Sequence, residues 1–118
     1  MEIRKIKQES TQVPDDTAIR HLSGTIYELI GNENVTPKQK IMDGEEVTVY
    51  ESELTHITTS ITRRDEMIAA LIRLRYTQDA EFALINKGIA DSTNTEYVAY
   101  RNYVTICKAQ ADIYYEEA

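Results

Sequence analysis

The dipeptide Asp43-Gly44 constrains the fold of this chain more than any other feature of its sequence. A type I′ turn needs positive φ at both central residues, and Asp-Gly adopts that geometry at little steric cost. Residues 38–42 end in an apolar pair, and residues 45–50 alternate in character. The sequence therefore predicts a β-hairpin with strands at 38–42 and 45–50, the second extending toward Ile57.

A further strand is expected at residues 25–31, which alternate between apolar and polar side chains. The alternative is a helix whose face carries Ile19, Leu22 and Ile26. Gly24 lies within that segment and disfavours the helix. The remaining expectations for this half of the chain are a short strand or loose arm at 2–7 and a turn at Pro14-Asp15-Asp16.

The composition changes near residue 60. Both prolines and three of the four glycines precede it, and helix-favouring runs follow it. This pattern predicts one α+β domain over residues 1–118, with residues 1–60 rich in strand and residues 61–118 helical. We expect a small antiparallel sheet, with the hairpin in the N-terminal half, packed by a C-terminal three-helix segment. Helices are expected at 62–75, 78–88 and 95–115.

Capping residues define the expected helix ends. Thr62 and Thr77 are placed to accept a hydrogen bond from a free backbone N–H of the following turn. The break at Tyr76-Thr77 is therefore interpreted as the elbow between two helices rather than as a catalytic corner. Lys87-Gly88 is typical of the end of a helix.

Apolar residues recur at steps of three and four along the last predicted helix, which indicates one buried face. We expect this face to pack onto Leu71, Ile72 and Phe82 of the two preceding helices. Its members are Tyr97, Tyr100, Val104, Cys107 and Ala111.

Tyrosine accounts for eight of the nine aromatic residues. Its ring packs while its hydroxyl stays hydrated, which suits half-buried and interface positions. Tyr103, Tyr114 and Tyr115 lie off the buried face or at its end, so they are the candidate interface residues. On this interpretation Tyr103→Ala would leave stability nearly unchanged, whereas Val104→Ala would open a cavity in the core.

Charge and hydropathy restrict the class of partner. The net charge of −7 argues against nucleic acid, because binding phosphates requires clustered Lys and Arg. No apolar run approaches the roughly 20 residues that a membrane helix needs. The charged, alternating N-terminus lacks the apolar segment of a secretory signal. We therefore expect a protein made in a cytoplasm and not exported by a signal peptide, with neither nucleic acid nor membrane as partner.

Few residues are candidates for chemistry. The single cysteine, Cys107, excludes an internal disulfide framework and a thiolate-rich zinc site. His21 and His56 are not spaced as a pair of metal ligands on one helix face. The acidic pairs at 15–16, 45–46 and 116–117 flank turns or the terminus. We therefore expect no catalytic residue, no cofactor and no metal.

Two segments carry a resemblance to a known group of proteins. They are RDEMIAALIRLRYTQDAEFALINKG, at 64–88, and TEYVAYRNYVTICKAQA, at 95–111. Together they resemble the end of small proteins encoded among tail and tail-fibre genes of phages and prophages of gut bacteria. The shared features fall at Leu71-Ile72-Arg73, Arg75-Tyr76-Thr77, Asp79 and Glu96-Tyr97.

The resemblance, with the lack of catalytic motifs and the tyrosine-rich helical half, implies a non-enzymatic virion structural or accessory protein. Such a protein would bind tail, fibre or capsid components and form a homo- or hetero-oligomer with other phage structural proteins. Two alternatives stay open. One is a cytoplasmic tail-fibre assembly chaperone, and the other is a small host-directed inhibitor or enzyme acting through Cys107 or a histidine.

Overall fold

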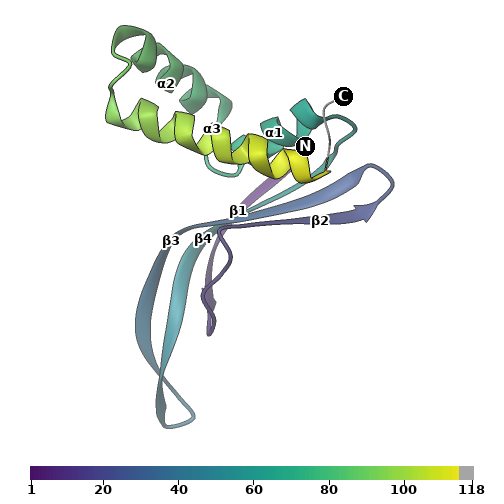
Figure 1. The fold of residues 1–118 in the computed structure, drawn as a ribbon. Helices are drawn as coiled ribbons and strands as arrows, with labels where there is room; N and C mark the ends of the chain where they lie inside the picture. Colours follow the sequence, from purple (N-terminus) through teal and green to yellow (C-terminus); the bar gives the residue numbers. More distant parts are fainter. Residues whose placement is uncertain (115–118) are drawn as a thin grey trace. The chain divides into compact units, whose positions relative to one another are not determined.

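The computed structural model describes residues 1–114, within two compact units: Met1–Ser60, and a second unit that starts at Ile61. The first unit is an antiparallel sheet and the second consists of helices (Figure 1). The predicted α+β class is therefore confirmed.

Four strands form the sheet, in the order β1-β4-β3-β2, and every neighbouring pair is antiparallel. The predicted strands at 25–31 and 38–42 are two parts of the single strand β3. The helical alternative near Ile19 is wrong, because that residue lies in β2. The strands are β1 Glu2–Ser10, β2 Thr17–Ser23, β3 Ile26–Met42 and β4 Glu45–Ser60.

The hairpin predicted at Asp43-Gly44 is confirmed. Asp43 has φ of 53° and Gly44 has φ of 78°, so both turn residues are in the left-handed region. Met42 pairs with Glu45 directly across the turn, and the ladder continues from there along both strands. A two-residue turn of this kind follows the right-handed twist of the strands that it joins.

A row of apolar side chains crosses one face of the sheet. Ile3, Ile57, Leu29 and Ile19 lie side by side across all four strands, and the central pair, Ile57 and Leu29, is fully buried. Successive side chains of a strand point to opposite faces. The next residue along each strand points to the other face, which carries both charged side chains, such as Glu28, and apolar ones, such as Ile30.

A β-bulge interrupts the ladder between β3 and β4. The register shifts between Glu33 and Thr36, and Asn34 has a positive φ of 53°. An extra residue in one strand bends it and increases its twist. Figure 1 shows β3 and β4 curving together and continuing beyond the ends of β1 and β2. We call this extension, residues 36–42 of β3 and 45–49 of β4, the β-ribbon.

A buried amide holds three segments of the sheet unit together. The side chain of Asn32 accepts hydrogen bonds from Gln8 Nε2, at 2.9 Å, and from the Ser52 hydroxyl, at 3.0 Å. Its Nδ2 donates to the carbonyl oxygen of Asp15, at 2.8 Å, and its backbone N–H donates to that of Asp16. Asn32 thereby links β1, β3 and β4 to the loop that precedes β2.

The helices of the second unit are α1 Arg64–Arg73, α2 Gln78–Ala90 and α3 Thr95–Tyr114. The cap predicted at Thr77 is confirmed, because its hydroxyl oxygen accepts from the backbone N–H of Ala80 at 3.1 Å. The cap predicted at Thr62 is wrong. Arg63 occupies the N-cap without a side-chain bond, and the backbone N–H and hydroxyl of Thr62 instead donate to the Glu66 carboxylate.

Gly88 does not end a helix, contrary to the prediction, because α2 continues to Ala90. The lack of a side chain at Gly88 serves packing instead. A Cβ built there would lie 2.3 Å from Cε1 of Tyr97, so the tyrosine ring lies directly against the helix backbone. Close contact between α2 and the start of α3 therefore depends on this glycine.

The contribution of the Thr77 cap to stability can be tested by substitution. Thr77→Ala removes the acceptor for the Ala80 N–H, and losing a cap of this type costs about 1 kcal/mol. We expect that decrease in the free energy of unfolding by urea denaturation. Thr77→Ser keeps the oxygen and should stay close to the wild type. Equal losses for both variants would show that the hydrogen bond is not the source of the effect.

Candidate protein-interaction surface

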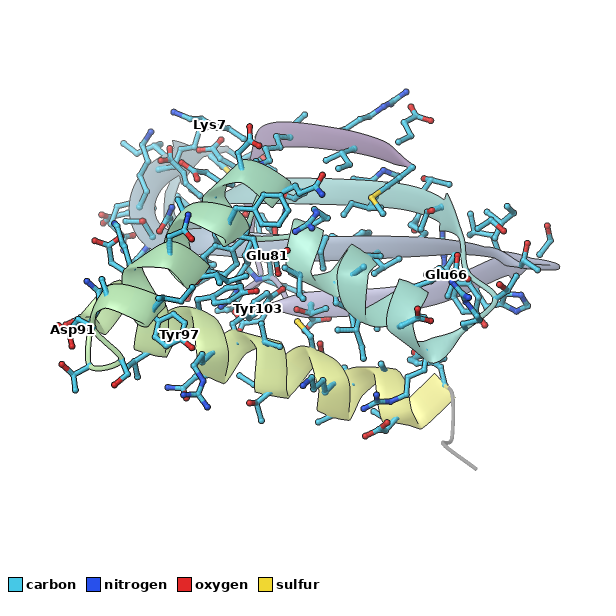
Figure 2. All side chains as sticks on the ribbon, turned by 90° about the horizontal axis from the view of Figure 1, so that it is seen from above. Lys7, Glu66, Glu81, Asp91, Tyr97 and Tyr103 are labelled. Atoms are coloured by element: carbon cyan, nitrogen blue, oxygen red, sulfur yellow. The ribbon has the colours of Figure 1, made fainter. Side chains whose placement is uncertain are left out.

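The predicted exposure of Tyr103 is wrong. Tyr103, labelled in Figure 2, is only 5% exposed. Its hydroxyl donates to the backbone oxygen of Leu71 at 2.6 Å. The carbonyl oxygen of Leu71, at the end of α1, also accepts from the backbone N–H of Leu74, so Tyr103 is its second donor. The guanidinium of Arg75 lies 4.5 Å from the centre of the Tyr103 ring.

The buried face of α3 is accordingly not the one predicted. Tyr100, Cys107 and Ala111 are buried as expected, but Tyr103 joins them, while Tyr97 and Val104 are only half-buried. Of the other two interface candidates, Tyr114 is exposed at the end of α3, and Tyr115 lies outside the described residues. An interface role for these tyrosines stays a prediction.

The break between α1 and α2 is a joint built from side chains of all three helices. Arg73 forms an ion pair of 2.9 Å with Glu81, and the hydroxyl of Tyr100 donates to the other oxygen of that carboxylate. The ring of Tyr76 lies edge-on to that of Tyr100, with 5.3 Å between centroids. Burial, together with the neighbouring carboxylate, raises the pKa of Tyr100. These contacts explain the elbow without any ligand.

The exposed apolar residues of α2 form the surface of most interest. Phe82, Ile85 and Ile89 are 55%, 38% and 80% exposed. Their spacing places them on one side of the helix. Leu84 is buried, and Gly88 lies against Tyr97 of α3. The side of α2 that packs is therefore the one that carries Leu84 and Gly88, next to the exposed side. We call the three exposed residues the α2 apolar flank.

Phe82 was expected to pack in the core against the last helix, but it is 55% exposed and is not a core residue. The sequence shows apolar residues around a broad arc of α2, from Leu84 through Ile85 to Phe82. Periodicity identifies the arc but not the part of it that a neighbouring helix covers. Gly88 determines which side of α2 packs, because the absence of a side chain there lets the Tyr97 ring of α3 lie close to α2 on the side of Leu84.

The candidate chemical residues do not form one site. By strand register His21 and His56 lie on opposite faces of the sheet. His56 Nε2 lies 2.9 Å from the Glu28 carboxylate, which also pairs with Arg20 at 3.1 Å. The hydrogen bond with His56 is the main cause that lowers the pKa of Glu28. Cys107 is fully buried in the helical unit, and burial raises the pKa of its thiol.

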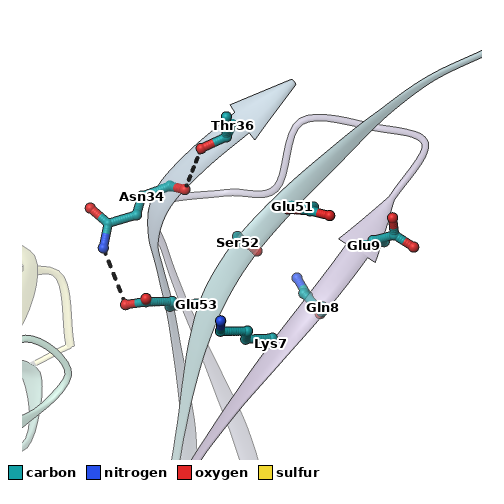
Figure 3. Close-up of a pocket in the computed structure, with 8 residues that line it drawn as sticks. All are labelled: Lys7, Gln8, Glu9, Asn34, Thr36, Glu51, Ser52 and Glu53. Carbon is teal, nitrogen blue, oxygen red and sulfur yellow. Dashed lines mark hydrogen bonds between the residues drawn. The ribbon is translucent and has the colours of Figure 1, made fainter. Parts of the chain in front are cut away.

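A polar hollow of about 540 Å³ lies at the bulge of the sheet (Figure 3). Glu53 accepts a hydrogen bond from Asn34 there, at 3.1 Å. The nearby Glu9 and Glu51 pair with Lys40 and Lys38, each at 3.0 Å. Over residues 1–114, no group of three or more His, Cys, Asp or Glu side chains is placed to hold a metal ion.

No known protein family, curated protein or solved structure matches the chain. Among the described residues, no helix combines the length and the apolar character needed to cross a membrane. The function is therefore inferred from the surface features of the two units.

Proposed function

We propose that this chain is a non-enzymatic structural or accessory protein of a phage particle, which binds a tail, fibre or capsid protein through the α2 apolar flank. The observation that carries the binding role is the exposure of Phe82, Ile85 and Ile89 along one side of α2. Grouped apolar side chains on a surface are typical of sites that another protein covers. A partner with an apolar surface of its own would remove all three from water at once.

The phage context is supported by the resemblance of residues 64–88 and 95–111 to proteins encoded among tail and tail-fibre genes. Both segments belong to the helical unit, and the first includes Phe82 and Ile85 of the α2 apolar flank. Phe82 is the strongest candidate for an anchor residue, because large rings that become fully buried dominate many interfaces.

Phe82→Glu tests the binding role in the full-length protein. The side chain is exposed, so we expect the free energy of unfolding to change by no more than about 0.5 kcal/mol. A charge placed in an apolar contact should nevertheless weaken binding by about 2 kcal/mol or more. Mass spectrometry of purified virions should detect the wild-type protein in the particle and lose it for Phe82→Glu.

Ile113→Glu is the matched control, because it places the same charge at an exposed isoleucine of α3. It should leave incorporation unchanged. A wild-type protein that never enters the particle would overturn the structural role. If a neighbouring fibre protein then becomes soluble only on co-expression, the assembly-chaperone alternative is correct instead.

A further inference from the structure

The β-ribbon has two free edges. Among the described residues, β2 pairs with β3 only as far as Gly31, and β1 pairs with β4 only as far as Tyr50. A two-stranded hairpin without further strands is marginally stable in water. Near its tip, Ile41 is 76% exposed and Met42 is also exposed. The β-ribbon therefore combines unpaired strand edges with uncovered apolar residues.

The pairing pattern shows which backbone groups point outward from the β-ribbon. The two residues that flank a two-residue turn form both backbone hydrogen bonds with each other. Along the ladder, such hydrogen-bonded pairs then alternate with pairs that are not hydrogen-bonded to each other. Ile41 and Gln39 of β3, and Glu46 and Thr48 of β4, consequently direct their N–H and C=O groups away from the partner strand. Pro37 lies at a further outward position, where its missing N–H does not interrupt the ladder.

The two edges carry opposite charge. Residues 36–42 contain Lys38 and Lys40 and no acid, whereas residues 45–49 contain Glu45 and Glu46 and no base. Lys38 already pairs with Glu51 of β4, and Lys40 pairs with Glu9 of β1, each at 3.0 Å. Those pairs are exposed and contribute little, so either lysine can turn to a new partner.

We propose that the β3 edge of one β-ribbon pairs with the β4 edge of a second copy of this chain. In an antiparallel register that joins outward-facing residues, Lys40 lies opposite Glu45 of the next copy. Pairing two β3 edges would instead place lysine opposite lysine, which is unfavourable. The contact joins unlike surfaces, so successive copies form a closed ring or an open chain rather than a twofold dimer. This inference does not depend on the phage assignment.

Charge reversal in the full-length protein tests the pairing by sedimentation velocity over a concentration series. The wild type should self-associate, more strongly at low salt. Lys38→Glu with Lys40→Glu, and separately Glu45→Lys with Glu46→Lys, should each weaken association about tenfold or more. An equimolar mixture of the two variants should restore it, because each then supplies the edge that the other lacks.

A backbone test avoids any change in charge. Ile41→Pro removes an outward N–H while leaving the hydrogen bonds within the hairpin, and it should weaken association. Ile41→Thr keeps the N–H in a strand-favouring residue and should associate more strongly than the proline variant. A wild type that stays monomeric throughout, reversed variants that associate like the wild type, or a mixture that does not recover would each overturn the proposal.

Discussion

Tyr103→Ala is expected to lower the free energy of unfolding by about 3–5 kcal/mol, the usual cost of removing a buried aromatic side chain. The ring is buried on α3, with Arg75 against one side and Tyr76 at 5.7 Å between centroids. Its hydroxyl also donates to Leu71. Small domains have only about 5–15 kcal/mol of stability, so this loss should remove a large part of it.

Urea denaturation followed by far-UV circular dichroism measures this loss directly. Tyr103→Phe is the matched control, because it keeps the ring and removes only the hydrogen bond, at about 1 kcal/mol. Leu71 O still accepts from the backbone N–H of Leu74 in that variant. A change below about 0.5 kcal/mol for Tyr103→Ala would place the tyrosine on the surface after all.

Asn32→Ala should produce the second large loss, about 2–4 kcal/mol, because burying an unpaired polar group costs about 1–3 kcal/mol. The substitution removes three side-chain hydrogen bonds at once. It leaves the hydroxyl of Ser52, a residue only 4% exposed, without its acceptor. Hydrogen exchange of the backbone amides should also become faster in the loop at 11–16, which Asn32 holds in place.

Ser52→Ala is the control for this prediction. It removes one hydrogen bond together with the group that needs it, so we expect a smaller loss of about 1 kcal/mol. Thermal and urea denaturation of both variants would rank them. If Asn32→Ala costs no more than Ser52→Ala, the amide does not act as the link between strands and loop.

Local signals in the sequence predicted much of this fold. Asp43-Gly44 located the hairpin, because two adjacent positive φ angles are readily adopted by few residue pairs. Thr77 located the start of α2, because its oxygen serves a backbone N–H only three residues away. Both features depend on neighbours in the chain, so no tertiary information was needed to find them.

The errors arose where distant residues decide the outcome. Tyr103 is buried because Leu71, far along the chain, supplies an acceptor for its hydroxyl. Gly88 resembled a helix end, yet its role is set by the ring of Tyr97 on another helix. Asn32 was missed because an isolated asparagine within a strand gives no sign of partners in β1, β4 and a loop. The spacing of Phe82, Ile85 and Ile89 along α2 is visible in the sequence, but their exposure is not.

The strand order has a consequence for how the nascent chain folds. The β3–β4 hairpin closes through a two-residue turn, whereas β1 joins β4 with Glu2 opposite Thr58, almost the full length of the sheet unit away. Contacts between distant residues cost more loop-closure entropy and form later. Of the four strands of this sheet, β1 is synthesised first but is the last to find its partner. Until the end of β4 emerges, β1 remains an unpaired segment available to chaperones and proteases.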